Sequence, residues 1–362
     1  MPNNNRIYFA IWQAGFSKVG QNVFIPVHGL QGLGITVNYN LDPVTELGQI
    51  NLYQNLEQVP DVSIDMSKTI DGYPPLYCLA TNGAVDQTLT GRANSQTTVG
   101  VSIFSDNNVS ASGTPISQLT VSGAFVASIG YNFVTDGMFT ENITLLATSK
   151  LWTTSAPFTF SGAFPGNNDQ PLSLTSGTGG VQRRQNMRFL PNPYVNLPTD
   201  ANGSSKPSPG VTRCTILPQD IPGISSSGTN DQVGGQYGAH IRDITVGCNL
   251  GREPLYELGR RFYYYRYVQF PVQVTCDITV TAHNGDLMSI TEAGVAGNGN
   301  NLSNRSIYLA TDEGLFIDLG TQNKVNTLSY GGGDTGGANL TLTYNYVNWD
   351  AMGVYHLMDP SF

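Results

Sequence analysis

Hydrophobic and polar residues alternate over several long stretches of this chain. A period of two places successive side chains on opposite faces of a strand, so each stretch predicts a strand with one buried face. The clearest stretches are residues 35–41, 62–66, 119–133, 139–147, 244–250, 272–280 and 340–346. Shorter apolar segments at 7–12, 23–27, 50–56 and 262–268 are also expected to be strands.

Two local features refine this pattern. Thr135-Asp136-Gly137 separates the segments 119–133 and 139–147, which predicts a long β-hairpin. Residues 71–80 are expected to begin a short helix, the only one in this half of the chain. Alternating strands with so little helix predict an all-β fold with minor α content.

Short motifs recur in the same order in both halves of the chain. Ile-Thr-Val begins at Ile35 and Ile244, and Glu-Leu-Gly occupies two positions with a similar separation. Tyr131 and Tyr344 each begin a Tyr-Asn-aromatic-Val segment. The separation stays near roughly 210 residues, which indicates a duplicated domain rather than a solenoid repeat. We therefore predict one domain at 1–155 and a diverged second copy at 231–362.

The segment between the copies, 156–230, has a different composition, rich in Pro, Gly and Ser. Prolines remove ladder donors and glycines add chain entropy, so a regular core element is not expected here. Two readings remain open, an extended linker and an arm or insertion that packs on a neighbouring subunit.

Composition narrows the class of protein. Charged residues make up 12% of the chain and the net charge is −9, whereas 40% of residues are hydrophobic. These values exclude a disordered chain and a basic nucleic-acid clamp. No apolar run approaches the ~20 residues of a membrane helix, and 7–12 is too short for a signal peptide. The four cysteines lack metal spacing and are expected to be thiols.

Catalytic chemistry is not evident in the sequence. It contains no GxSxG, HExxH or P-loop motif, so no catalytic residue, cofactor or metal site is predicted and the protein is not expected to be an enzyme. The polar feature shared by both copies is Glu-Leu-Gly. A buried or interfacial glutamate must be paired, which favours a structural salt bridge or a subunit contact. Our candidate interface or structural residues are Glu46, Leu47, Gly48, Glu257, Leu258, Gly259, Tyr131 and Tyr344.

Residues 32–77, which contain GITVNYNL, TELGQINLYQNL and IDGYPPLY, together with ASIGYNFVTDGMFTENITLLATSKLW, resemble the major tail tube proteins of tailed bacteriophages. The resemblance covers most of the first copy and, in diverged form, the second. It implies two tandem β-sandwich or barrel domains with long antiparallel hairpins. Six such domains close a ring in that family, so a duplicated chain would form a pseudo-hexameric trimer ring.

The resemblance also implies a role and partners. Stacked trimer rings would form a hollow tube in the virion tail, assembled in the bacterial host cytoplasm, that conducts the genome during ejection. Partners would be other copies of the chain and tail proteins such as a sheath, tape measure, hub or terminator. Viral DNA would pass without specific binding, and no membrane would be involved.

Two alternatives remain. A low-copy tail hub or tube-end protein could share this architecture. From a different class, the tyrosine-rich second copy and the Asn- and Thr-rich strands are also compatible with a carbohydrate-binding, adhesive β-sandwich protein.

Overall fold

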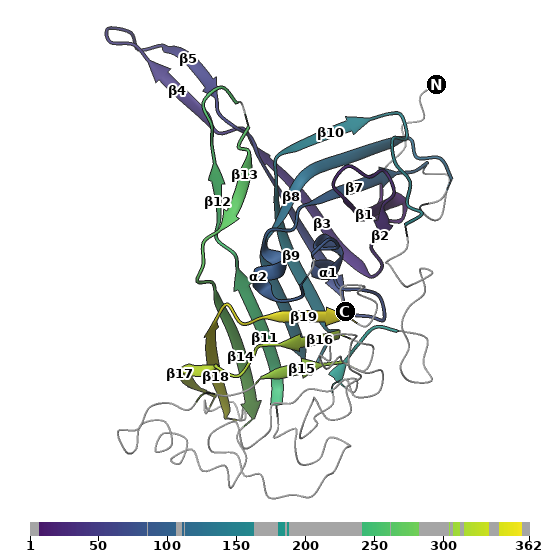
Figure 1. Cartoon of the computed structure of the whole chain (residues 1–362), viewed down its shortest axis with the longest axis vertical. Coiled ribbons are helices and arrows are strands. Elements are labelled where there is room, and N and C mark those ends of the chain that lie inside the picture. The colour runs from purple at the N-terminus through teal and green to yellow at the C-terminus, as the bar shows by residue number, and fades with distance from the viewer. Residues whose placement is uncertain are drawn as a thin grey trace, which may run out of the picture.

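The computed structural model describes residues 7–84, 86–105, 111, 113–162, 180–184, 187, 241–260, 262–281, 304, 307–311, 315–332 and 340–356. Within these ranges the chain is almost entirely β, and its named strands all pair antiparallel (Figure 1). This confirms the predicted all-β class. Most of the predicted insertion at 156–230 lies outside the described residues.

The helical elements are short and follow local signals. The helix α1 begins directly after Pro74-Pro75, and the helix α2 begins after Thr88, whose hydroxyl accepts the backbone N–H of Gly91. The expected helix near 71–80 is thus confirmed, but α2 shows that it is not the only one in this half. The helical elements are η1 (Phe9–Ile11), α1 (Leu76–Ala80) and α2 (Leu89–Ala93).

The strands account for most of the described residues. They are β1 (Trp12–Lys18), β2 (Ile25–Pro26), β3 (Leu30–Asn38), β4 (Leu41–Thr45), β5 (Leu52–Glu57), β6 (Asp61–Thr69), β7 (Thr97–Ile103), β8 (Ser117–Val134), β9 (Thr140–Ala147), β10 (Ser149–Thr153), β11 (Ile241–Asn249), β12 (Arg252–Leu255), β13 (Tyr265–Val268), β14 (Gln273–Thr281), β15 (Tyr308–Ala310), β16 (Leu315–Asp318), β17 (Lys324–Gly331), β18 (Thr341–Trp349) and β19 (Gly353–His356).

One continuous antiparallel sheet, which we call the main sheet, contains strands from both halves of the chain. Its order is β3-β6-β9-β8-β11-β14-β18-β17. The first four strands come from one half and the last four from the other, and β8 joins them by pairing with β11. Each half therefore contributes four strands in the same order. Its first two strands in sequence are neighbours in the sheet, and the last strand in sequence pairs with the second, so that the third lies at the end of the unit.

The long strand β8 also takes part in a second group of strands. Its N-terminal part pairs with β10 on one side and β7 on the other, and β7 continues to β1 and β2. We call this group the side sheet. A register shift near Gly123, whose φ is +66°, accompanies the departure of this part of β8 from the main sheet. The described residues of the second half contain no equivalent of the side sheet.

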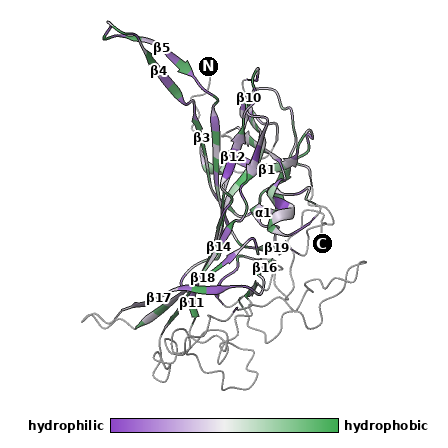
Figure 2. Ribbon diagram, turned by 60° about the vertical axis from the view of Figure 1, so that its left-hand side comes forward, coloured by the Kyte–Doolittle hydropathy of each residue, from purple (hydrophilic) through white to green (hydrophobic). Residues whose placement is uncertain are grey.

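The two faces of the main sheet differ in chemistry. One face is apolar, and α1 and β16 and β19 lie on that side of the curved sheet (Figure 2). A single hydrophobic core there includes Ile64, Leu145, Val246, Ile278 and Tyr344 from both halves. The burial of every second residue in β6, β9, β14 and β18 follows directly from the alternation in the sequence.

The opposite face, which we call the polar face, carries short and mostly neutral side chains, and none of its residues is buried. Its charged members include the carboxylates Asp65 and Asp277, which accept hydrogen bonds from Thr144 and Asn345. Asp243, opposite Thr279, and the cation Lys324, in the row of Thr275 and Val347, also lie on this face. The other members of the polar face include Gly34, Thr36, Ser67, Asn142, Thr144, Ser128, Gly130, Asn132, Thr245, Gly247, Thr275, Thr279, Thr343, Asn345, Thr327 and Ser329.

Some sequence predictions were wrong in position. The N-terminal strand does not span 7–12: residues 9–11 form a 3-10 turn and β1 begins at Trp12. The stretch 35–41 is not one strand: β3 ends at Asn38, and β4 begins at Leu41 and contains Pro43, opposite Asn55. Proline is tolerated there because β4 belongs to a two-stranded ribbon and has an unpaired side.

The buried thiols lead to a first prediction. Cys78, Cys248 and Cys276 are present as buried thiols, and burial raises the pKa of Cys248 to about 12. At pH 8 only about one part in ten thousand of Cys248 would be thiolate, which is the reactive form. We expect native protein to leave Cys248 unmodified by a maleimide under conditions that label a Thr245→Cys variant, whose new thiol lies on the polar face of the same strand. Peptide mapping that finds Cys248 labelled as fast as the introduced cysteine would contradict this. Cys214 lies outside the described residues.

Candidate assembly surface

Two β-ribbons of matching construction project from the main sheet (Figure 1). The arm β4–β5 leaves the first half after β3, and the arm β12–β13 leaves the second half after β11. Their registers correspond: Leu41 lies opposite Glu57 in one arm, as Arg252 lies opposite Val268 in the other. Both arms begin between the first and second strands of their half, so they are equivalent elements of the repeat.

The repeated Glu-Leu-Gly motif forms the tip of each arm. In both copies the glutamate carbonyl accepts the backbone N–H three residues later, at a distance of 3.3 Å. Gly48 and Gly259 have φ values of +92° and +85°, which fit the third position of a type II turn. Turn geometry thus gives a local reason for the motif in both copies, and neither glutamate is buried.

The tip side chains point into solvent. Leu47 and Leu258 are fully exposed, and Glu46 and Glu257 are exposed as well. Glu257 forms an exposed ion pair with Arg260 at 3.3 Å. Such a pair contributes little to stability. Because a leucine is exposed at the end of each arm, a contact with a neighbouring subunit stays our proposal for these residues.

The arm β12–β13 is docked on the first half of its own chain. The Arg252 guanidinium lies over the Phe125 ring and donates from Nε to the Val126 carbonyl at 2.7 Å, and burial lowers its pKa to about 10. Tyr265 packs edge-on against Phe125 and its hydroxyl donates to the Asn94 carbonyl. A polar and aromatic contact of this kind fixes the arm along β8.

An ion pair with one buried partner completes this docking. The Arg266 guanidinium, 4% exposed, binds the carboxylate of Asp61, whose side chain is 42% exposed, and lies 4.2 Å from the centre of the Tyr263 ring. The buried guanidinium therefore has its charge partner at the protein surface and an aromatic face beside it.

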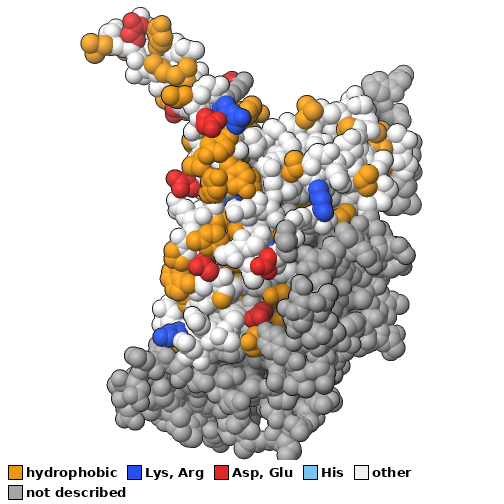
Figure 3. Space-filling view, in the orientation of Figure 1, with side chains coloured by type: hydrophobic (Ala, Val, Ile, Leu, Met, Phe, Trp, Pro, Cys, Tyr) orange, Lys and Arg blue, Asp and Glu red, His pale blue; other side chains and the backbone are white. Residues whose placement is uncertain are grey.

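The arm β4–β5 has no such support among the described residues. Every residue of β5 is exposed, and so are all residues of β4 except Val44. A two-stranded ribbon alone in water is at best marginally stable. Hydrophobic side chains nevertheless cover its end (Figure 3). The exposed ones are Leu41, Leu47, Ile50, Leu52, Tyr53 and Leu56.

The contrast between the arms gives a second prediction. Arg266→Ala is expected to lower the free energy of unfolding by roughly 2 kcal/mol, because it removes a charge-assisted hydrogen bond to Asp61 and uncovers Tyr263. Asn55→Ala changes the equivalent position of the exposed arm and should have an effect within about 0.5 kcal/mol. Urea denaturation of the unassembled protein measures both. Equal effects would mean that the docked arm is not stabilised by this pair.

The two predicted tyrosines lie in the core instead of on the surface. Tyr131 on β8 and Tyr344 on β18 are each 1% exposed. The strands are not equivalent, because β18 lies between β14 and β17 as β9 lies between β6 and β8. The sequence match between these segments therefore does not mark matching places in the sheet. Both tyrosines are structural residues in this chain.

Tyr131 belongs to a buried polar network that sequence reasoning missed. Glu141 on β9 accepts the Tyr131 hydroxyl at 2.8 Å, the backbone N–H of Tyr77 at 2.9 Å and that of Leu76. The carboxylate therefore caps the first turn of α1 and attaches this helix to the sheet. Burial raises the pKa of Glu141, against the opposing effect of these donors and of Lys68.

Lys68 lies directly opposite Glu141 across the strand pair and is also buried. Its ammonium donates to Asp71 and to the His28 carbonyl, each at 2.6 Å, while burial lowers the pKa of Lys68. The only sequence signal for this network was a Lys and a Glu at core positions of two alternating strands.

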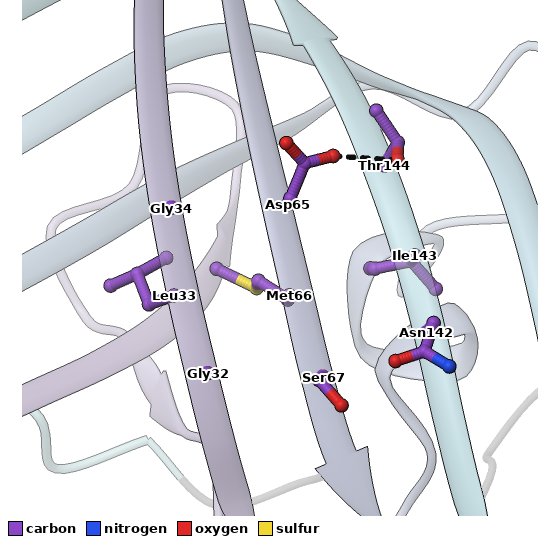
Figure 4. Close-up of a pocket in the computed structure, with 9 residues that line it drawn as sticks. All are labelled: Gly32, Leu33, Gly34, Asp65, Met66, Ser67, Asn142, Ile143 and Thr144. Atoms are coloured by element: carbon purple, nitrogen blue, oxygen red, sulfur yellow. Dashed lines mark hydrogen bonds between the residues drawn. The ribbon is translucent and has the colours of Figure 1, made fainter.

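The described residues offer little for catalysis. They contain no group of three or more His, Cys, Asp or Glu side chains that could hold a metal ion. An open depression of about 340 Å³ lies on β3, β6 and β9 (Figure 4). The Thr144 hydroxyl donates to the Asp65 carboxylate at 2.7 Å, and the lining of the depression contains no His, Cys or Lys. Among the helices described here, none is long and apolar enough to cross a bilayer. The depression is lined by Gly32, Leu33, Gly34, Asp65, Met66, Ser67, Asn142, Ile143 and Thr144.

The main sheet ends in two strands whose outer sides have no partner strand in the described part of the chain. These are β3 at the first-half end and β17 at the second-half end. The exposed tyrosines Tyr39 and Tyr330 lie at these edges, beside the hydrophobic arm β4–β5 at one of them. We call β3, β17 and the arm β4–β5 together the assembly surface.

Comparison with known proteins gives structural matches only; no family model and no curated protein matches the sequence. One similar chain comes from the sheath-tube complex of an extracellular contractile injection system in the extended state (13% identity, TM-score 0.31), which covers 42% of this chain and 95% of that chain. Another comes from the tube-terminating cap of the anti-feeding prophage, with 14% identity and a TM-score of 0.32. The match covers 43% of this chain and 95% of that chain. A third is Hcp1 from Flavobacterium johnsoniae, with 8% identity and a TM-score of 0.23. The match covers 40% of this chain and 96% of that chain.

Proposed function

We propose that this protein is a non-enzymatic structural subunit that polymerises through its assembly surface into rings, which stack into the hollow tube of a phage tail or a related particle. The observation that carries the proposal is the construction of the main sheet. Among the described residues it has one polar face that no element covers, two terminal strands that lack a partner strand on one side and an undocked hydrophobic arm. The sequence resemblance to phage tail tube proteins supports it.

Open strands are a liability for a protein that stays monomeric. Natural monomers protect sheet edges with charges, prolines, bulges or covering loops. The edge strand β3 carries no charged residue and no proline over Leu30–Asn38, although a register shift interrupts its start. Ring closure removes both edges, because each terminal strand acquires a partner from the neighbouring chain.

The polar face suits the lining of a bore through which DNA moves. Its small Gly, Ser, Thr and Asn side chains leave the surface smooth, and the carboxylates of Asp65, Asp243 and Asp277 outnumber the cation Lys324 at the edge strand. DNA affinity comes chiefly from cations that neutralise phosphates. A lining with more carboxylates than cations would therefore let DNA slide without being gripped.

Two copies of the sheet unit in one chain set the stoichiometry of the proposed ring. If six units close it, three chains suffice, which gives threefold symmetry with pseudo-sixfold sheets. The side sheet, present in the first half, would then appear three times around the outside.

Electron microscopy of purified protein tests the proposal. We expect rings and stacked tubes with an open pore, and class averages down the axis with threefold symmetry and six similar inner segments. Single rings that never stack would favour a low-copy hub or tube-end protein of the same fold. Dispersed monomers at all concentrations and salt conditions would contradict self-assembly altogether.

A further inference from the structure

Within one chain, the two four-strand units of the main sheet are joined by the pairing of β8 with β11, which we call the internal junction. Its geometry suggests how a junction between two chains would form. Within the chain, β8 is the last strand of the first unit in the sheet and β11 is the first strand of the second. They pair antiparallel, with Ile129 opposite Cys248 and Tyr131 opposite Val246. All four side chains are buried.

The terminal strands of the main sheet are the counterparts of this pair. By sheet position, β17 corresponds to β8 and β3 corresponds to β11. A neighbouring copy that presented β3 to β17 would repeat the internal junction. Other combinations, β3 with β3 or β17 with β17, have no counterpart inside the chain.

The register of the first strand follows from the Ile-Thr-Val motif. Ile35 lies opposite Ile64 as Ile244 lies opposite Ile278. Tyr39 is therefore the counterpart of Cys248.

The register of the last strand follows by counting across the two units. Ile64 faces Leu145, and Ile278 faces Tyr344, so β9 and β18 are aligned by these residues. Two residues earlier on each, Ile143 faces Ile129 and Leu342 faces Tyr330. Tyr330 is therefore the counterpart of Ile129.

Resting on the proposed function, we propose that β17 of one copy pairs antiparallel with β3 of the next, with Tyr330 directly opposite Tyr39. The arm β4–β5 then lies along the second half of that neighbour, as β12–β13 lies along the first half of its own chain. The partner at this surface is thus a second copy of this chain, in one defined register.

Burial supports this register. Tyr39 and Tyr330 are 55% and 41% exposed, whereas their counterparts Cys248 and Ile129 are 5% and 4% exposed. A directly opposed aromatic pair on the core side of two strands stabilises a sheet junction. The two exposed tyrosines are therefore at the positions where the internal junction is buried.

The arms show the same correspondence. Leu41, 56% exposed, is the counterpart of Arg252, which covers Phe125 within the chain. Leu328 on β17 is the counterpart of Val126, beside which the docked arm lies. The exposed arm thus has the apolar Leu41 where the docked arm has Arg252, whose guanidinium lies over the aromatic ring of Phe125.

The contact is head-to-tail, which determines the shape of the product. A β3–β17 contact uses two different surfaces, so repeated addition closes a ring if the rotation allows, or else continues as an open polymer. Because the internal junction already fixes one step of the rotation, the intermolecular step should repeat it.

Disulfide trapping tests the register. The variant Tyr39→Cys/Tyr330→Cys is assembled, verified by electron microscopy, oxidised and analysed by non-reducing gels and peptide mapping. A matched control, Tyr39→Cys/Leu328→Cys, moves one cysteine by two residues on the same face. Each single-cysteine variant controls for random coupling and for reaction with the native thiols.

We expect the first pair to form intermolecular disulfides at least tenfold faster than the control, because directly opposed Cα atoms lie within disulfide range and diagonal ones do not. The covalent ladder should stop at three chains if the ring closes there. Rings or tubes whose control pair couples as fast, or in which neither pair couples, would overturn the register and leave the proposed function intact. If these variants do not assemble, the same pairs are assayed at Asn38→Cys/Gly331→Cys, the neighbouring row of the same register. Absence of any assembly in the unmodified protein would overturn both proposals.

Discussion

Glu141→Ala is expected to lower the free energy of unfolding by roughly 3–5 kcal/mol, the cost typical of breaking a buried charge network. The substitution leaves the Tyr131 hydroxyl and the N–H groups of Leu76 and Tyr77 without their acceptor in the core. It also removes the carboxylate opposite the buried ammonium of Lys68. Chemical denaturation of the unassembled protein measures the effect, and the matched control is Asp65→Ala on the polar face of the adjacent strand β6.

The control should change stability by less than about 1 kcal/mol, because Asp65 is exposed and has one neutral hydrogen-bond partner in Thr144. A loss at Glu141 no larger than that at Asp65 would show that the carboxylate does not hold α1 to the sheet.

The pH dependence of the same variants adds a separate readout. Burial raises the pKa of folded Glu141 above its ordinary value of 4.5. A group with a raised folded pKa stabilises the fold fully below its unfolded pKa and loses that contribution as pH rises through the folded pKa. The stability advantage of the natural protein over Glu141→Gln, which does not titrate, should therefore shrink as pH increases above about 4.5. An advantage that grows over that range would contradict the direction of the shift.

Tyr39→Asp is expected to raise the protein concentration needed for assembly by on the order of 100-fold, since burying an uncompensated carboxylate in the proposed junction costs several kcal/mol. The monomer should keep its stability, because Tyr39 is 55% exposed there. Sedimentation and electron microscopy across a concentration series measure the assembly threshold. Adding Tyr330→Lys places a cation directly opposite the new carboxylate and should restore part of the lost assembly.

A matched control comes from the side sheet. Leu151→Asp alters an exposed leucine on β10, 64% exposed and outside the assembly surface, and should leave the threshold unchanged. If Leu151→Asp blocks assembly as strongly as Tyr39→Asp, the effect reflects surface charge in general. If Tyr330→Lys gives no recovery, the two positions are not opposite each other.

The strand content could be predicted from the sequence because alternation is a local property. Residues 62–66 and 272–280 became strands with the expected buried parity, since a half-buried strand needs apolar residues at every second position. The segment 119–133 also became a strand, but its burial changes phase in the middle, where Ala124 and Val126 are buried in place of Ala127 beside a register shift. The hairpin β8–β9 followed from Thr135-Asp136-Gly137, whose turn chemistry is also local. Where a segment lacked alternation, as at 7–12, the prediction placed the strand too early.

The candidate residues show the same limit, because short motifs report local backbone geometry and not the place of a segment in the sheet. Glu-Leu-Gly was correctly singled out as a repeated feature, but the reason for its recurrence is a type II turn at each arm tip, which needs Gly48 and Gly259 at positive φ. Tyr131 and Tyr344 share a sequence motif yet occupy different places in the repeat. A short stretch of sequence does not specify which strand it will pair with.

By itself, the amino-acid sequence determined the all-β class and the phase of burial along the regularly alternating strands, because both depend on neighbouring residues, and it predicted a repeated unit from short recurring motifs. Only the tertiary structure decided that β8 and β11 join the two halves into one sheet, that Glu141 holds α1, and that one arm is docked while the other is exposed. These features depend on contacts between residues far apart in the sequence, such as Asp61 and Arg266, which are 205 positions apart. A short-range periodicity contains no information about which distant strand supplies the partner.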